Sequence, residues 1–128
     1  MTLMLTPKAA LLLSTITMAA IDGELDKNEI AIMNRLDGFS LSDEWDLAIA
    51  AWDVTPVDEC ILLITKVLNP KQQRVALANM VDIAMSDGSF TQDENYLLSA
   101  YAKAFDVLDK DVERIVDVIT IKNDQSLF

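Results

Sequence analysis

Residues 22–29 of the chain read DGELDKNE, and residues 87–94 read DGSFTQDE. Each copy contains an Asp-Gly pair, an apolar residue, a residue that can cap a helix, and a Glu. The flanking residues also match at this offset of 65 residues, as Leu12 and Leu77 illustrate. A match that extends into the flanking segments predicts a duplicated helical unit.

In both copies the Asp-Gly pair is expected to end one helix, and the residues after it to start the next. Glycine readily adopts the left-handed conformation that closes a helix C terminus. Asp26 and Glu29 have the spacing of a capping box, in which each side chain accepts a hydrogen bond from the other residue's backbone N–H. Thr91 and Glu94 have the same spacing in the second copy. This structural interpretation explains the shared residues without a ligand.

Proline and capping residues indicate where the other helices begin. Thr6-Pro7, Thr55-Pro56 and Asn69-Pro70 each combine a capping residue with proline at the first helical position. With helical spacing of apolar residues, these signals predict helices over about 6–21, 26–37, 42–53, 55–68, 69–86, 91–105 and 109–121. The same spacing predicts a core that includes Leu12, Ile16, Trp45, Trp52, Cys60, Ile64, Leu77, Val81, Leu98, Tyr101 and Phe105.

These elements predict an all-α fold: one domain over residues 1–128, a bundle of about seven helices built from two related three-helix halves. The halves cover about 6–53 and 71–121, and the helix between them is a connector. A hydrophobic content of 52% with only three Gly and three Pro fits helices better than a many-stranded sheet. The tail from Lys122 to Phe128 is expected to fray.

The charge of the chain restricts its partners. The formal net charge is −11, so nucleic-acid phosphates and anionic membranes are repelled over most of the surface. We therefore expect no direct binding to nucleic acid, and a protein partner instead. The single Cys60 cannot form an internal disulfide, which favours a reducing compartment, and the expected location is the cytoplasm.

The apolar run at residues 9–21 has two interpretations. It follows Lys8 and ends in small residues, as the core of a signal peptide does. However, its counterpart at residues 76–85 lies in the middle of the chain, and the run is too short and too rich in Ser and Thr to span a bilayer. The run is therefore interpreted as a domain helix, and no transmembrane segment is predicted.

The loops partly match a calcium-binding EF-hand. Asp22, Asp26 and Glu29 fall on ligand positions, but Met18 and Ala20 occupy the first two and offer no side-chain oxygen. A true EF-hand is excluded. A weakly bound divalent cation (Ca²⁺, Mg²⁺ or Mn²⁺), with water completing its shell, remains open. The candidate ligands are the carboxylates in or near the two loops: Asp22, Glu24, Asp26, Glu29, Asp82, Asp87, Asp93 and Glu94.

The chain lacks the usual catalytic groups. It contains no His, which excludes a histidine base and a Ser-His-Asp triad, and no glycine-rich phosphate loop is present. A protein without enzymatic activity is expected. Two alternatives remain: a metal-assisted hydrolase that uses the acidic clusters, and an acidic decoy for a nucleic-acid-binding protein.

Residues 19–26 with Glu29, and 84–90 with Glu94, resemble the repeated signature "A-x-x-D-G-x-hydrophobic…E" of the TerB-like family, which is associated with tellurite resistance and related bacterial stress and phage-defence systems. The resemblance extends from about Leu5 to Ile121. It implies a helical bundle of two related halves that acts by binding in cytoplasmic or membrane-linked complexes, with acidic residues that hold metal. The acidic positions carried over are Asp22, Asp26, Glu29, Asp87 and Glu94. Thr91 replaces the Asp in the second copy.

Overall fold

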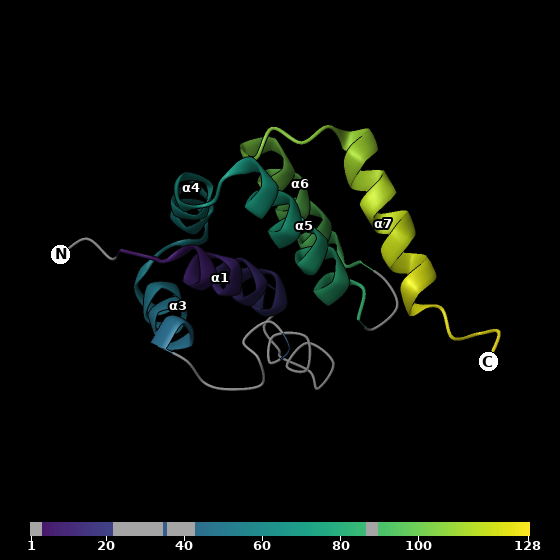
Figure 1. The fold of residues 1–128 in the computed structure, drawn as a ribbon, viewed down its shortest axis with the longest axis horizontal. Coiled ribbons are helices and arrows are strands. Elements are labelled where there is room, and N and C mark those ends of the chain that lie inside the picture. Colours follow the sequence, from purple (N-terminus) through teal and green to yellow (C-terminus); the bar gives the residue numbers. More distant parts are fainter. Residues whose placement is uncertain (1–3, 22–34, 36–42, 87–89) are drawn as a thin grey trace.

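The computed structural model describes residues 4–21, 35, 43–86 and 90–128. Within these ranges the chain forms six helices and no strand, which confirms the predicted all-α class. Figure 1 shows their arrangement. The predicted helix over 26–37 lies outside the described residues except for Arg35, which is helical. The helices are α1 (Pro7–Ala20), α3 (Asp43–Val54), α4 (Val57–Val67), α5 (Pro70–Ala84), α6 (Gln92–Ala104) and α7 (Asp109–Asn123).

Helix α1 is the centre of the bundle. Ten of its 14 residues are buried, and it packs against α3, α4, α5 and α6 (Figure 1). Three of the buried residues, Ser14, Thr15 and Thr17, carry hydroxyl groups. Each hydroxyl donates a hydrogen bond to the backbone carbonyl three residues earlier, at 2.6 to 2.8 Å. Because buried polar groups are tolerated only when they are paired, these bonds allow α1 to be covered on nearly every face.

The predicted caps of α1 and α5 are confirmed. Thr6 Oγ1 accepts a hydrogen bond from the Ala9 amide at 3.1 Å. Asn69 and Gln72 form a complete capping box, with both bonds at 2.9 Å. These side chains satisfy amides that have no partner within the helix. The starts of α1 and α5 are therefore fixed by their own local sequences. The predicted end of α5 at Ser86 is two residues too late, since the helix ends at Ala84.

The prediction that Thr55 caps α4 is wrong. The helix begins at Val57, its N-cap residue is Pro56, and no side chain caps it. Pro56 has ψ of 151°, an extended conformation that keeps it outside the helix. Asp58 and Glu59 lie in the first turn instead, where negative charge interacts favourably with the helix dipole.

The turn after α6 was not predicted from the sequence. Asp106 has φ of 56°, and the Val107 amide donates to the Ala102 carbonyl at 2.9 Å while the Asp106 amide donates to the Lys103 carbonyl. This is the Schellman pattern, in which the left-handed position is usually glycine. Asp106 stands where a glycine would have marked the turn in the sequence. Asp can adopt the left-handed conformation, as Asn can, but it is common in many other settings and so gave no signal.

Tyr101 joins α6 to α1. Its side chain is fully buried, and its hydroxyl lies 2.6 Å from Thr17 Oγ1. Burial raises the pKa of the Tyr101 hydroxyl above its ordinary value, although the Thr17 bond opposes part of that shift. The buried phenol is therefore held in its neutral form.

This pKa shift predicts a loss of stability at alkaline pH. Tyr101 of the unfolded chain ionises near pH 10, whereas the folded chain keeps it neutral to higher pH. The contribution of the buried, neutral Tyr101 to the free energy of unfolding is therefore complete below about pH 10 and decreases as the pH rises above that value. Between pH 10 and 11 the free energy of unfolding should fall more steeply in the wild type than in Tyr101→Phe, by up to about 1.4 kcal/mol per pH unit. Urea unfolding at several pH values measures this difference. Tyr96→Phe, at an exposed position of the same helix, should keep the wild-type slope; equal slopes for all three proteins would contradict the prediction.

Helix α7 is the most exposed helix described. None of its residues is buried, and it lies at the edge of the molecule, packed against α5 (Figure 1). Its apolar residues Val112, Ile115, Val116 and Ile119 are partly buried against the core. The expectation that the tail frays from Lys122 is wrong for its first two residues, because α7 continues to Asn123.

Candidate functional site

The predicted cation ligands fall into two groups. Asp22, Glu24, Asp26, Glu29 and Asp87 lie outside the described residues. The other three are described. Asp93 is exposed in the first turn of α6, whereas Asp82 and Glu94 are both buried, at 4% and 3% exposed. The structure therefore describes only the side of the predicted site that belongs to α5 and α6.

Glu94 forms the predicted capping box with Thr91. Glu94 Oε1 accepts a hydrogen bond from the Thr91 amide at 2.8 Å, and Thr91 Oγ1 accepts one from the Glu94 amide at 3.1 Å. The structural interpretation of this half of the second loop is confirmed. At least one oxygen of Glu94 already accepts a backbone hydrogen bond, which limits what it could offer to a cation.

Thr91→Ala should lower the free energy of unfolding by about 1 kcal/mol, because it leaves the Glu94 amide without its side-chain acceptor. Urea unfolding measures the loss. Gln92→Ala changes the next position without touching the capping box, and should have an effect within about 0.5 kcal/mol. Equal losses for the two variants would show that the Thr91 hydroxyl contributes nothing to the start of α6.

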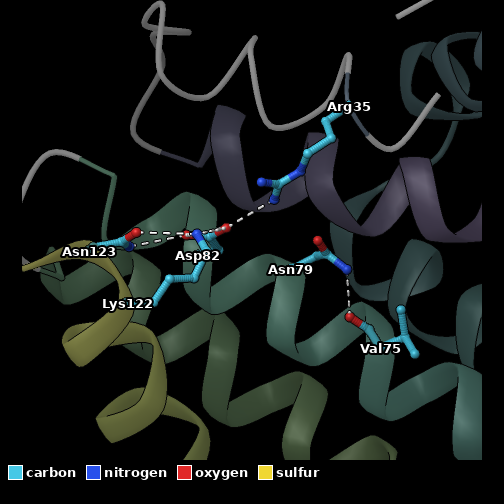
Figure 2. A network of polar contacts seen from close by, with 6 residues as sticks. All are labelled: Arg35, Val75, Asn79, Asp82, Lys122 and Asn123. Atoms are coloured by element: carbon cyan, nitrogen blue, oxygen red, sulfur yellow. Dashed lines mark hydrogen bonds and ion pairs between the residues drawn. The ribbon is translucent and has the colours of Figure 1, made fainter. Parts of the chain in front are cut away.

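Asp82 is surrounded by donors from distant parts of the chain. Arg35 Nη2 donates to Asp82 Oδ2 at 3.3 Å, Lys122 Nζ lies 3.3 Å from the same oxygen, and Asn123 Nδ2 donates to Oδ1 at 3.1 Å. Figure 2 shows the carboxylate of Asp82 between Arg35 on one side and the end of α7 on the other. The cluster thus ties α5 to α7 and to Arg35.

The chemistry of this cluster differs from that of an open cation site. Two cationic side chains and an amide face one carboxylate, so a metal ion at Asp82 would have to displace Lys122 or Arg35. Among the described residues no three acidic, Cys or His side chains come together as a metal-binding group. Part of the predicted ligand set is therefore held by the protein's own donors.

Sequence reasoning identified Asp82 but not its partners. Arg35 and Lys122 lie 47 and 40 residues away from it, and neither belongs to a motif. The one signal in the sequence was a lone acid on α5, a helix whose other residues are neutral or basic. A buried carboxylate needs a partner, but the sequence does not say which cation it is.

Five exposed carboxylates lie on α3 and at the start of α4. Asp43, Asp46 and Asp53 lie on one face of α3, at helical spacings of three and seven residues. Asp58 and Glu59 are exposed at the start of α4. We call these five residues the acidic surface. Lys66 is the one basic residue between positions 43 and 67, and none of the five acids has an ion-pair partner among the described residues.

The other candidate residues belong to the core. Cys60 is fully buried, as predicted, and its thiol donates weakly to the Thr55 carbonyl at 3.5 Å. Burial, together with the charge of Glu59, raises the pKa of the Cys60 thiol, which is the opposite of what a reactive thiolate needs. Trp45 and Trp52 are partly buried and pack against the core.

Comparison with known proteins supports one family. A family model described as "Tellurite resistance protein TerB" matches residues 40–117, more than half of the chain. The match includes the second Asp-Gly loop but not the first. No curated protein and no solved structure matches the chain. In the part of the chain that the structure describes, no helix is long and apolar enough to cross a membrane. With its all-helical fold and its repeated acidic loop, the chain belongs to the TerB family.

Proposed function

We propose that this chain is a TerB-like binding module without catalytic activity, and that its acidic surface on α3 and α4 holds a basic segment of a protein partner. The observation that carries the proposal is the group of five exposed carboxylates in a stretch, residues 43–67, where Lys66 is the one basic residue. We further propose that it acts in the cytoplasm, in a stress response of the tellurite-resistance type.

Physical reasoning supports a basic partner. Like charges along one face of a helix repel one another, so a cationic partner relieves an unfavourable interaction as well as forming new ones. The net charge of −11 extends this attraction over the whole molecule and increases the rate at which a basic partner arrives. The same charge opposes binding to nucleic-acid phosphates.

The experiment separates the local surface from the net charge. A lysine-rich peptide is titrated into the full chain labelled with ¹⁵N, and its affinity is measured at several salt concentrations. One variant neutralises Asp46, Asp53 and Asp58 to Asn. The control variant removes the same number of charges from α7, by Asp109→Asn, Glu113→Gln and Asp117→Asn.

If the acidic surface is the site, affinity should fall about tenfold in the first variant and less than about threefold in the control. Amide shifts should be concentrated on α3 and α4. Equal losses in the two variants, or shifts spread over all helices, would mean that only net charge attracts the peptide, and would reject the proposed site.

We also propose that the acidic loops hold a divalent cation weakly. The support comes from the repeated carboxylates Asp22, Asp26, Glu29 and Asp87, together with Glu24, and from their match to half of a calcium loop. Titration with Ca²⁺, Mg²⁺ or Mn²⁺ at millimolar concentration should raise the melting temperature and shift the loop amides. Glu24→Gln with Asp93→Asn should remove that response while sparing the capping boxes. An unchanged wild type would reject the cation but leave the partner proposal standing.

The hydrolase alternative makes a different prediction. A metal-assisted hydrolase would turn over phosphoesters or nucleotides in the presence of Mn²⁺, whereas a binding module would give no turnover above the metal-only rate. Assay of the purified chain on such a panel therefore distinguishes the two, and turnover that is lost in Asp87→Asn would overturn the proposal.

A further inference from the structure

We infer that a groove between α5 and α7 is a second docking surface, and that it receives an amphipathic helix of a protein partner with acidic residues at one end. The groove is open and has a volume of about 260 Å³. Its lining comes from Ala78 of α5 and from Arg114, Ile115, Val118 and Ile119 of α7.

The groove continues into exposed apolar side chains on both helices. Val75, three residues before Ala78 on α5, is 52% exposed, and Val118 on α7 is 63% exposed. Ile121, the next residue along that side of α7, is 75% exposed. Residues three or four apart share a helix face, so these side chains extend the apolar lining along the groove. Exposed apolar residues that gather on one face are typical of an interaction site.

The groove has a defined direction. Lys122 of α7 pairs with Asp82 of α5, and Thr120 contacts Met85 at 3.8 Å, so the ends of the two helices meet. The helices therefore run in the same direction, as Figure 1 shows, and their first turns lie at the same end. Asp82 and Lys122 lie near the far end of the groove.

Basic residues gather at the end where both helices begin. Lys71 and Arg74 lie seven and four residues before Ala78 on α5, and Lys110 lies four residues before Arg114 on α7; all four are exposed. By helical spacing Lys71 and Arg74 share the face of Ala78, and Lys110 shares that of Arg114. Four of the ten Lys and Arg residues of this acidic protein therefore rim the groove. Arg114 contacts Asp111 at 3.4 Å, but 74% of its side chain remains exposed.

The acids of α7 offset part of this local charge. Asp111 contacts Arg114 and lies four residues before the groove-lining Ile115, and Asp109 is exposed beside Lys110. On α5, Lys71 and Arg74 face no such acids, because Asp82 is the one acidic residue of that helix and lies near the far end of the groove. An occupant therefore meets an apolar floor and, on the α5 side of one end, a cationic rim. An amphipathic helix complements this surface when its apolar stripe fills the floor and its acidic residues face the rim. This surface is distinct from the acidic surface, since α3 and α7 lie at opposite ends of the molecule (Figure 1).

The test uses designed helical peptides and the full chain labelled with ¹⁵N. The first peptide has leucines at positions i, i+3, i+4 and i+7 and glutamates in the turn at one end. A second peptide replaces these glutamates by lysine, and a third keeps them but replaces the leucines by serine. The proposal predicts that only the first peptide binds, and that it shifts the amides of α5 and α7.

Matched variants locate the binding. Val118→Ser and Arg114→Glu should each weaken the first peptide at least about tenfold. Leu62→Ser and Lys66→Glu change a similarly exposed leucine and an exposed lysine on α4, and should weaken it less than twofold. No binding by the wild type, equal binding of the lysine peptide, or equal losses in the α4 variants would overturn the proposal. Concentration-dependent dimerisation that Val118→Ser abolishes would also overturn it, since the occupant would then be a second copy of the chain.

Discussion

Leu77→Ala is expected to lower the free energy of unfolding by about 3 to 5 kcal/mol, a larger loss than that expected from removing the cap at Thr91 or the charge of Asp82. Leu77 is fully buried on α5, the helix that packs against α1, α6 and α7. Truncating a buried leucine loses its transfer free energy and leaves a cavity that a packed core fills only partly. Because a domain of this size is stable by only about 5 to 15 kcal/mol, the variant should be close to unfolding at physiological temperature.

The control for this prediction lies two residues away. Val75 belongs to the same helix but is 52% exposed, so Val75→Ala should change stability by less than about 0.5 kcal/mol. Urea unfolding monitored by circular dichroism measures both variants. A loss below about 2 kcal/mol for Leu77→Ala would mean that α5 can move into the cavity, and would argue against a rigid core between α1 and α5.

The parts of the fold that were predicted correctly depend on neighbouring residues. The predicted caps Thr6, Asn69 and Thr91 each accept a hydrogen bond from the backbone amide three residues later. Their position in the sequence therefore determines the geometry of the cap. The buried positions of Leu77 and Cys60 follow in the same way from helical periodicity.

The failures have physical reasons as well. Thr55-Pro56 has the composition of a cap followed by a first helical residue, yet proline is equally compatible with the extended conformation before a helix. The turn at Asp106 lacks the glycine that would have marked it. In both cases two backbone conformations fit the same residues, and packing decides between them.

The candidate site was predicted only in part. Asp82 and Glu94 were both predicted as candidate cation ligands, and the cap formed by Glu94 was also predicted. The contacts of Asp82 with Arg35, Lys122 and Asn123 depend on how α5 and α7 pack, which no local pattern encodes. The proposed cation ligands around Asp22 and Asp87 remain predictions. The contacts of Asp82 with Lys122 and Asn123 predict a different role for that residue, which is to hold α7 on α5.

Asp82→Asn is expected to loosen α7, with a loss of about 1 to 3 kcal/mol in the free energy of unfolding. Asp82 is nearly fully buried, whereas the Arg35 and Lys122 side chains are 51% and 49% exposed. Removing the charge therefore leaves two cations that water can still solvate, which limits the loss. Since no residue of α7 is buried, its attachment to α5 should depend strongly on the ionic contacts at Asp82.

Hydrogen exchange locates this effect. In Asp82→Asn the amides of the last two turns of α7 should exchange at least about tenfold faster. The amides of α1 should exchange faster only by the factor that the overall loss of stability accounts for. Asp117→Asn removes an exposed charge of α7 that has no ion-pair partner among the described residues, and should leave exchange almost unchanged. Added salt should accelerate exchange in the wild type toward the Asp82→Asn value, because screening weakens contacts between partly exposed charges. Uniform acceleration over all helices would contradict a local role, because Asp82 would then stabilise the bundle as a whole rather than hold α7 on α5.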